Sequence, residues 1–111
     1  MSTALAYVIK YVGSMADAVR FYRDELGLKL RFESSHWTEF DTGGTTLALH
    51  LASDEHPPGT CSVGFRVADL GAFYAQKSGA QINFISAPTL LHGQMLAKFV
   101  DTDGAECGIS G

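Results

Sequence analysis

The chain has 111 residues, of which 46% are hydrophobic and 18% charged, and its formal net charge at pH 7 is −4. This length fits one domain with a modest core, and the composition excludes a disordered or low-complexity chain. Lys and Arg form no cluster and no apolar run is long enough to cross a membrane, so we expect neither a nucleic-acid nor a membrane partner.

The first half of the chain begins with a predicted strand and a predicted helix. Residues 5–12 alternate in hydrophobicity and are rich in Tyr, Val and Ile, which is typical of a strand. Ser14 can cap the free N–H groups of a following helix, and Asp17 favours its first turn. Gly27 is expected to end the helix, because glycine readily adopts the left-handed conformation of a C-cap. The apolar stripe of this helix consists of Ala18, Val19, Phe21, Tyr22 and Leu26.

Three predicted strands complete this half. In the first of them, Leu30 and Phe32 alternate with charged residues, so we expect both apolar side chains to face the helix. Arg31 and Glu33 then lie on the opposite face or at its rim. The three strands cover residues 28–33, 36–41 and 45–52, with a turn at residues 41–44.

The second half of the chain repeats the first. DAVRFYRDELGLKLRF begins at Asp17, and DLGAFYAQKSGAQINF begins at Asp69 with Asp, Phe, Tyr, Gly and Phe at matching positions. This match indicates an internal duplication of a βαβββ unit. We therefore expect a single domain over residues 1–111, made of two repeats at about 1–54 and 60–111 that are joined by a linker at 53–60.

The elements of the second half follow the same plan. Its predicted helix spans residues 69–78, with Asp69 as the cap and Gly79 as the stop. The other predicted elements are strands at 61–67, 81–86, 94–100 and 105–110 and a turn at 101–104. The side chains that we expect to be buried beneath the two helices are Phe21, Leu30, Phe73 and Ile82.

Four segments resemble one protein family in the right order and at the right spacing. They are FYRDELGLKL at 21–30, SVGFRVADL at 62–70, SGAQI at 78–82 and KFVDTDGAE at 98–106. Together they resemble the vicinal oxygen chelate superfamily of glyoxalases, bleomycin resistance proteins and dioxygenases. The resemblance implies an α+β fold in which two tandem βαβββ modules form one curved mixed sheet. It places a concave cup on one side of this sheet and the helices on the convex side.

The resemblance also implies four positions where metal-dependent members of the superfamily hold a divalent ion. In this sequence these positions fall on Tyr7, His50, Ser62 and Gly108. Only His50 is a good ligand, because a phenol resists deprotonation, a hydroxyl binds weakly and glycine has no side chain. We therefore expect a degenerate metal site and no cofactor. A divalent metal held by His50 and Glu106 with a third group, such as His36, His92 or the substrate, remains open. His50 and Glu106 are the candidate catalytic residues.

Strand parity assigns side chains to the expected cup. In LALHL at residues 47–51 the leucines are expected to face a helix, which turns His50 toward the cup. His50 is then either a hydrogen-bonded residue that fills the place of a metal or a residue that contacts a ligand. Trp37 either lines the cup or packs against a partner subunit. The candidate ligand-binding residues are Tyr7, Tyr11, Trp37, Glu39, His50, Ser62 and Arg66.

Two classes of function follow. The first is a metal-free binding protein, similar to bleomycin resistance protein, that sequesters a small aromatic or cationic compound in the cup. Glu33, Glu39 and Trp37 favour this class, because acidic groups attract cations and aromatic faces stabilise them. The alternative is a metal-dependent glyoxalase-like lyase or isomerase, or a dioxygenase-type enzyme, with a shifted site that uses His50 and Glu106.

The expected location is cytoplasmic and the expected assembly is a homodimer. MSTALAYVIK lacks the pattern of a secretory signal, and Cys61 and Cys107 form no CxxC pair. The cysteines are read most simply as two reduced, buried thiols, while a disulfide or a reactive thiol stays open. An open cup with exposed aromatic residues favours pairing of two chains, which the resemblance also implies.

Overall fold

The computed structural model describes residues 2–79 and 81–111. Met1 and Ala80 fall within the expected repeats but lie outside the described residues. The chain forms two units, an N-terminal unit of residues 6–62 and a C-terminal unit of residues 63–111 with residues 2–5. Each unit has the order βαβββ, which confirms the α+β class and the duplicated plan.

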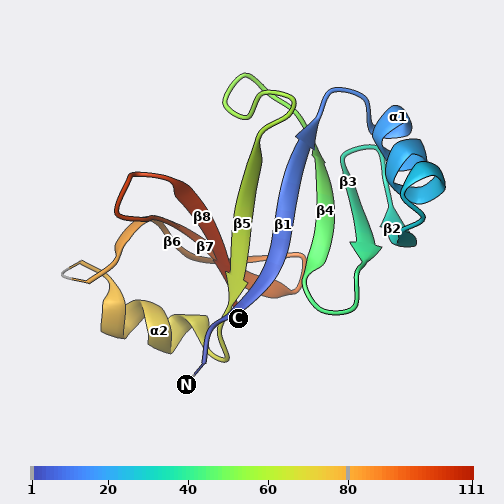
Figure 1. Cartoon of the computed structure of the whole chain (residues 1–111). Helices are drawn as coiled ribbons and strands as arrows, with labels where there is room; N and C mark the ends of the chain where they lie inside the picture. The colour runs from blue at the N-terminus through green and yellow to red at the C-terminus, as the bar shows by residue number, and fades with distance from the viewer. Residues whose placement is uncertain (1, 80) are drawn as a thin grey trace. The chain divides into compact units, whose positions relative to one another are not determined.

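In the N-terminal unit, four strands lie in the order β2-β3-β4-β1, and β5 begins beside β1. β3 runs antiparallel to β2 and β4, whereas β1 pairs with β4 in parallel. Figure 1 shows α1 at the β2 and β3 end of these strands. The elements are β1 (Ala4–Val12), α1 (Met15–Arg20), a π-helical segment η1 (Phe21–Glu25), β2 (Lys29–Glu33), β3 (Trp37–Asp41) and β4 (Thr46–Leu51).

The predicted helix ends of this unit are confirmed. The Ser14 hydroxyl accepts a hydrogen bond from the Asp17 backbone N–H at 3.2 Å. Gly27 has a φ of 74°, in the left-handed region that glycine enters without strain. Both residues act through local backbone geometry, which is why the sequence alone could place them.

The core of the N-terminal unit lies between α1 and one face of its strands. Met15 and Val19 of α1 pack on Phe40 of β3 and Leu49 of β4, and all four side chains are buried. Leu47 and Leu49 therefore face the helix as their parity predicted, and Leu30 joins the same cluster half-buried. This packing leaves the opposite face of the strands for other contacts.

The expected burial of Phe21 is wrong. Its side chain is 51% exposed, and Leu26 is exposed as well. The helix changes from α to π at Phe21, and the extra residue per turn rotates the apolar stripe. Tyr22 then occupies the inward position, with its ring 6.1 Å from that of Phe40. The other side chains expected beneath the helices, Leu30, Phe73 and Ile82, are half-buried.

The expected orientation of Phe32 and Glu33 is also wrong. Leu30 lies opposite Phe40 and Phe32 lies opposite Glu39, so Arg31 is an extra residue on β2. This β-bulge reverses the side-chain alternation beyond it. Phe32 consequently shares the face of Glu39, away from α1, whereas Glu33 moves to the face of the helix.

In the C-terminal unit, four strands lie in the order β5-β8-β7-β6. α2 lies beside β6 and β7, and Figure 1 draws this helix in yellow. The elements are β5 (Cys61–Arg66), α2 (Leu70–Lys77), β6 (Asn83–Leu91), β7 (Gln94–Val100) and β8 (Glu106–Ser110). The buried core consists of Val67, Leu70, Ala97 and Ile109.

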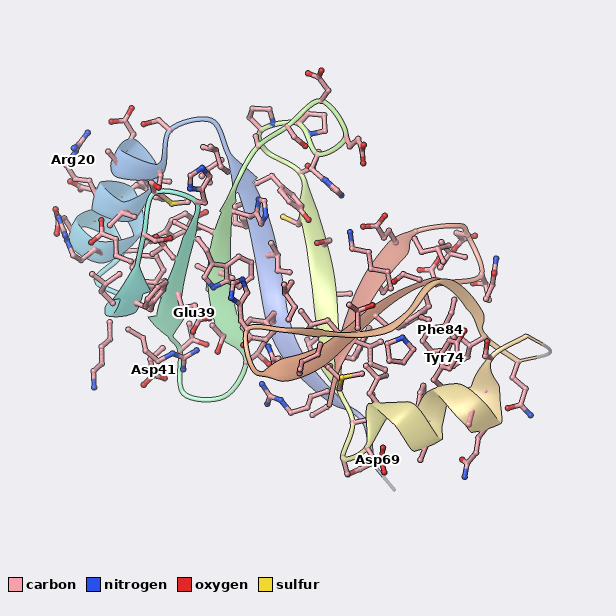
Figure 2. All side chains as sticks on the ribbon, turned by 180° about the vertical axis from the view of Figure 1, so that it is seen from behind. Arg20, Glu39, Asp41, Asp69, Tyr74 and Phe84 are labelled. Atoms are coloured by element: carbon pink, nitrogen blue, oxygen red, sulfur yellow. The ribbon has the colours of Figure 1, made fainter. Side chains whose placement is uncertain are left out.

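The helix ends of this unit are as predicted. Asp69 accepts a hydrogen bond from the Ala72 backbone N–H at 3.0 Å, and Gly79 has a φ of 94°. The rings of Tyr74 on α2 and Phe84 on β6 meet edge to face with their centroids 4.9 Å apart. Figure 2 labels both side chains. β6 continues to Leu91, five residues beyond the predicted end of the strand.

The two cysteines differ in their surroundings, and both are free thiols. Burial raises the pKa of the Cys107 thiol, and the nearby carboxylates of Asp101 and Glu106 raise it further. The expectation of a buried Cys61 is wrong, since this residue is exposed. Its Sγ accepts a hydrogen bond from Lys10 Nζ at 3.7 Å. None of the helices in the described residues is long and apolar enough to span a membrane.

Candidate ligand-binding site

The face of the N-terminal strands that points away from α1 gathers most of the predicted site residues. The register places Trp37 opposite His50 and Tyr11 beside His50, so one row crosses β3, β4 and β1. Tyr7 lies on the same face of β1, since every second residue of a strand shares a side. Parity and register together therefore produce an aromatic surface from three strands that are distant in sequence.

The rings on this face form a continuous series. Tyr7 and Trp37 meet edge to face with centroids 6.0 Å apart, and Trp37 and His50 do so at 5.9 Å. Tyr11 lies 5.4 Å from His50 and is stacked on His56 at 4.4 Å. We name these five residues the ring row. Edge-to-face and offset contacts of this kind are favourable beyond the area they bury, so the rings support one another.

A small residue lies beneath the ring row. Ala48 occupies β4 between the positions of Thr46 and His50 and is fully buried, although it points away from α1. Side chains of Tyr7 and Trp37 can approach each other over this alanine because its methyl group leaves room for them. A larger residue at this position would separate the two rings.

Glu39 connects the ring row to Arg31. Its Oε2 accepts a hydrogen bond from the indole Nε1–H of Trp37 at 2.8 Å. Its Oε1 accepts from Arg31 Nη2 at 3.0 Å, and the same nitrogen donates to the hydroxyl of Thr46. Figure 2 labels Glu39 on β3, among the side chains of this face. The carboxylate thus fixes the plane of the indole and neutralises the guanidinium.

The imidazole of His50 is exposed and has a defined tautomer. Its Nδ1 lies 2.7 Å from the carbonyl oxygen of Leu51. A carbonyl oxygen only accepts, so Nδ1 carries the proton of the neutral ring, and Nε2 retains a lone pair. His50 can therefore accept a hydrogen bond from a ligand through Nε2.

Tyr11 and Ser62 form a second polar contact at the end of the ring row. Their hydroxyl oxygens are 3.0 Å apart, and either can donate. Tyr11 is only 8% exposed, so this hydroxyl pair satisfies a phenol that is largely removed from water. Ser62 thereby supports the ring row, and its oxygen is already engaged.

The remaining predicted residues belong to the C-terminal unit. Arg66 is exposed on β5, next to Phe65, which packs into the core below α2. Gly108 lies opposite Gly64 on the neighbouring strand. Glu106 forms an ion pair with Lys98, with Oε1 and Nζ 3.3 Å apart. The described residues, 2–79 and 81–111, hold no group of three His, Cys, Asp or Glu side chains that could bind a metal ion.

Two members of the face were not predicted. His56, in the loop between the repeats, stacks on Tyr11, and only the path of that loop brings it there. Phe32 joins the face because of the bulge at Arg31. Neither residue carried a sequence signal, since no glycine or proline marks the bulge.

Two hollows of the surface lie elsewhere. One of about 330 Å³ is lined by Val8 and Leu47 with three threonines of the N-terminal unit. Another of about 340 Å³ lies in the C-terminal unit beside Ile82 and Phe99. Neither includes a residue of the ring row. Within its own unit His50 is exposed and Tyr7 and Trp37 are half-buried, so part of the aromatic surface of the row can contact a planar molecule.

The chain belongs to the Glyoxalase/Bleomycin resistance protein/Dioxygenase superfamily, whose family model matches residues 4–107. This result confirms the family that the four sequence segments resembled. A search of curated proteins gives no match.

Several solved structures share the fold. A protein of Legionella pneumophila described as an NAD-dependent benzaldehyde dehydrogenase is 21% identical, with a TM-score of 0.74 over 98% of this chain and 97% of its own. A hypothetical protein of Bacillus halodurans C-125 is 18% identical, with a TM-score of 0.75 over 99% and 94%. A superfamily member from Vibrio splendidus 12B01 is 13% identical, with a TM-score of 0.66 over 98% and 97%. Identities this low establish a common fold and leave the function to the site.

Proposed function

We propose that this protein binds and sequesters a small aromatic or cationic compound on the face that carries the ring row. The carrying observation is the row itself, in which Tyr7, Trp37, His50 and Tyr11 meet in edge-to-face or tilted contacts on one side of the strands. A flat ligand can stack on such rings, and a few polar groups can fix its orientation. His50 Nε2 supplies a hydrogen-bond acceptor at the centre of the row.

The donor chemistry supports binding without a metal. The positions where metal-dependent relatives carry ligands hold a phenol, an imidazole, a hydroxyl and a glycine in this chain. The Ser62 hydroxyl is engaged by Tyr11, and a Cβ at Gly108 would have ordinary contacts, so a ligating side chain there is sterically feasible but absent. One imidazole with neutral oxygens does not fit a tightly held divalent ion, so we propose that the usual metal site is degenerate.

Titration with quinoline, a planar aromatic base, tests this proposal. Trp37 is the only tryptophan, so a ¹H–¹⁵N spectrum contains one indole cross-peak that reports on the site. We expect quinoline to shift this peak and the amides of His50 and Tyr11, with a binding free energy of about −4 kcal/mol and a Kd near 1 mM. Unshifted peaks at about ten times that concentration would contradict the proposal.

A metal-dependent enzyme is the second candidate, and the tautomer of His50 favours it. Metal-bound histidines usually donate their other N–H to a carbonyl or carboxylate, as His50 Nδ1 does to Leu51. His50 with Glu106 would then serve a shifted site of a lyase, isomerase or dioxygenase type.

Metal analysis separates the two candidates. If the protein binds its ligand without a metal, inductively coupled plasma analysis of protein purified without chelator is expected to find less than stoichiometric Ni, Zn, Mn or Fe. Stoichiometric metal that is lost in His50→Ala would establish the second candidate instead.

We further propose that the protein is a homodimer. Among residues 2–79 and 81–111, six large apolar side chains are at least half exposed, and pairing of two chains would cover such side chains. They are Phe21, Leu26, Phe32, Ile85, Leu90 and Leu91. Sedimentation equilibrium at micromolar concentration is expected to give twice the chain mass of 11.9 kDa. A mass of one chain that does not change with concentration would exclude the dimer.

We also propose that the protein is located in the cytoplasm. Both cysteines are free thiols, and one of them is exposed. Reducing compartments maintain exposed thiols in this state, which supports the cytoplasm over an oxidising environment.

A further inference from the structure

The acidic groups that the sequence offers to a cationic ligand are not available on the ring-row face. Glu33 lies opposite Thr38, whose buried side chain contacts Met15, so Glu33 belongs to the face of α1. This follows from the bulge at Arg31, which reverses the alternation of β2. Of the two glutamates that were expected to attract a cation, Glu33 and Glu39, only Glu39 therefore shares the face with Trp37.

Both oxygens of Glu39 are already bonded. Oε1 accepts from the guanidinium of Arg31 and Oε2 accepts from the indole of Trp37. In this ion pair the side chain of Glu39 is 21% exposed and that of Arg31 is 44% exposed. The guanidinium is thus the more exposed partner of the pair, so a cation gains little from the carboxylate that it compensates.

The other charged residues on this face of the strands also form a pair of opposite charges. Lys29 lies directly opposite Asp41, next along the two strands from Arg31 and Glu39. Figure 2 labels both Asp41 and Glu39 on β3. In strands β1 to β4, all of whose residues are described, this face carries two cations and two carboxylates, so their formal charges cancel.

We propose that the ring-row face selects planar aromatic molecules without positive charge, and that Arg31, placed by its β-bulge, is the residue that excludes cations. This inference rests on the proposed function and narrows its ligand class. Arg31 acts through charge compensation of Glu39, and the ligand contacts the rings.

Two probes of nearly the same shape test the inference, namely quinoline and the permanent cation N-methylquinolinium. Both are titrated into the whole protein at pH 8, where quinoline is neutral, and followed through the indole cross-peak of Trp37. We expect quinoline to bind the wild-type protein at least tenfold more tightly. In Arg31→Gln the carboxylate of Glu39 is uncompensated, and the ratio of the two dissociation constants should shift about tenfold in favour of the cation.

Two further variants serve as controls. Arg23→Gln is matched, because Arg23 is also 44% exposed and paired with a carboxylate, Asp24, but lies on η1. It should keep the wild-type ratio. Arg31→Lys retains the positive charge and should also stay close to the wild-type ratio, which separates the charge of Arg31 from any loss of folding in Arg31→Gln.

The outcomes distinguish this inference from the proposed function. N-methylquinolinium binding to wild type as tightly as quinoline would overturn the inference and leave the binding site intact. An unchanged ratio in a folded Arg31→Gln protein would also overturn it. If neither probe shifts the indole peak in wild type or in Arg31→Gln, the proposed function itself is wrong.

Discussion

Phe40→Ala is expected to lower the free energy of unfolding by about 3–5 kcal/mol. The Phe40 side chain projects from β3 toward α1 and is fully buried against Met15, Val19 and Leu49. Truncation removes the transfer free energy of the ring and leaves a cavity that the surrounding helix and strands fill only in part. A loss of this size is a large share of the stability of a small domain.

Urea denaturation followed by circular dichroism measures this change, and Phe32→Ala is the matched control. Phe32 is 53% exposed on the neighbouring strand, so its truncation should cost no more than about 0.5 kcal/mol in the monomeric unit. Simple alternation along β2 predicted that Phe32 faces the helix, in which case its truncation would cost about as much as that of Phe40. Equal destabilisation by the two variants would therefore contradict the bulge at Arg31.

Trp37→Ala is expected to weaken quinoline binding by about tenfold or more. The indole contacts Tyr7 on one side and His50 on the other, so its removal opens a gap in the middle of the ring row. A planar ligand then loses its largest stacking surface, and the ring contacts on either side lose their support. Binding is followed through the backbone amide of His50, because the indole peak is no longer present.

Phe21→Ala controls for the removal of an aromatic side chain from the same unit. Phe21 is exposed on η1, beside Tyr22 and away from the ring row. Its removal should leave the quinoline Kd within about twofold of wild type. A folded Trp37→Ala protein that binds quinoline as well as Phe21→Ala does would place the ligand elsewhere.

The local features of this protein could be read from the sequence. Ser14 and Asp69 cap their helices, and Gly27 and Gly79 end them, because capping depends only on residues a few positions apart. The family and the duplicated βαβββ plan were equally accessible, since they depend on motif order and spacing. Parity also placed Leu49 toward the helix and His50 away from it.

Tertiary structure decided the parts of the site that parity could not reach. An added residue at Arg31 and a π-helical segment at Phe21 each shift the side-chain phase, and no local residue signals either change. The stacking of His56 on Tyr11 depends on the path of a loop, and the pairing of Glu39 with Arg31 depends on the register of two strands. Such features arise because a strand or helix adjusts its geometry to pack against its neighbours, which a single segment cannot encode.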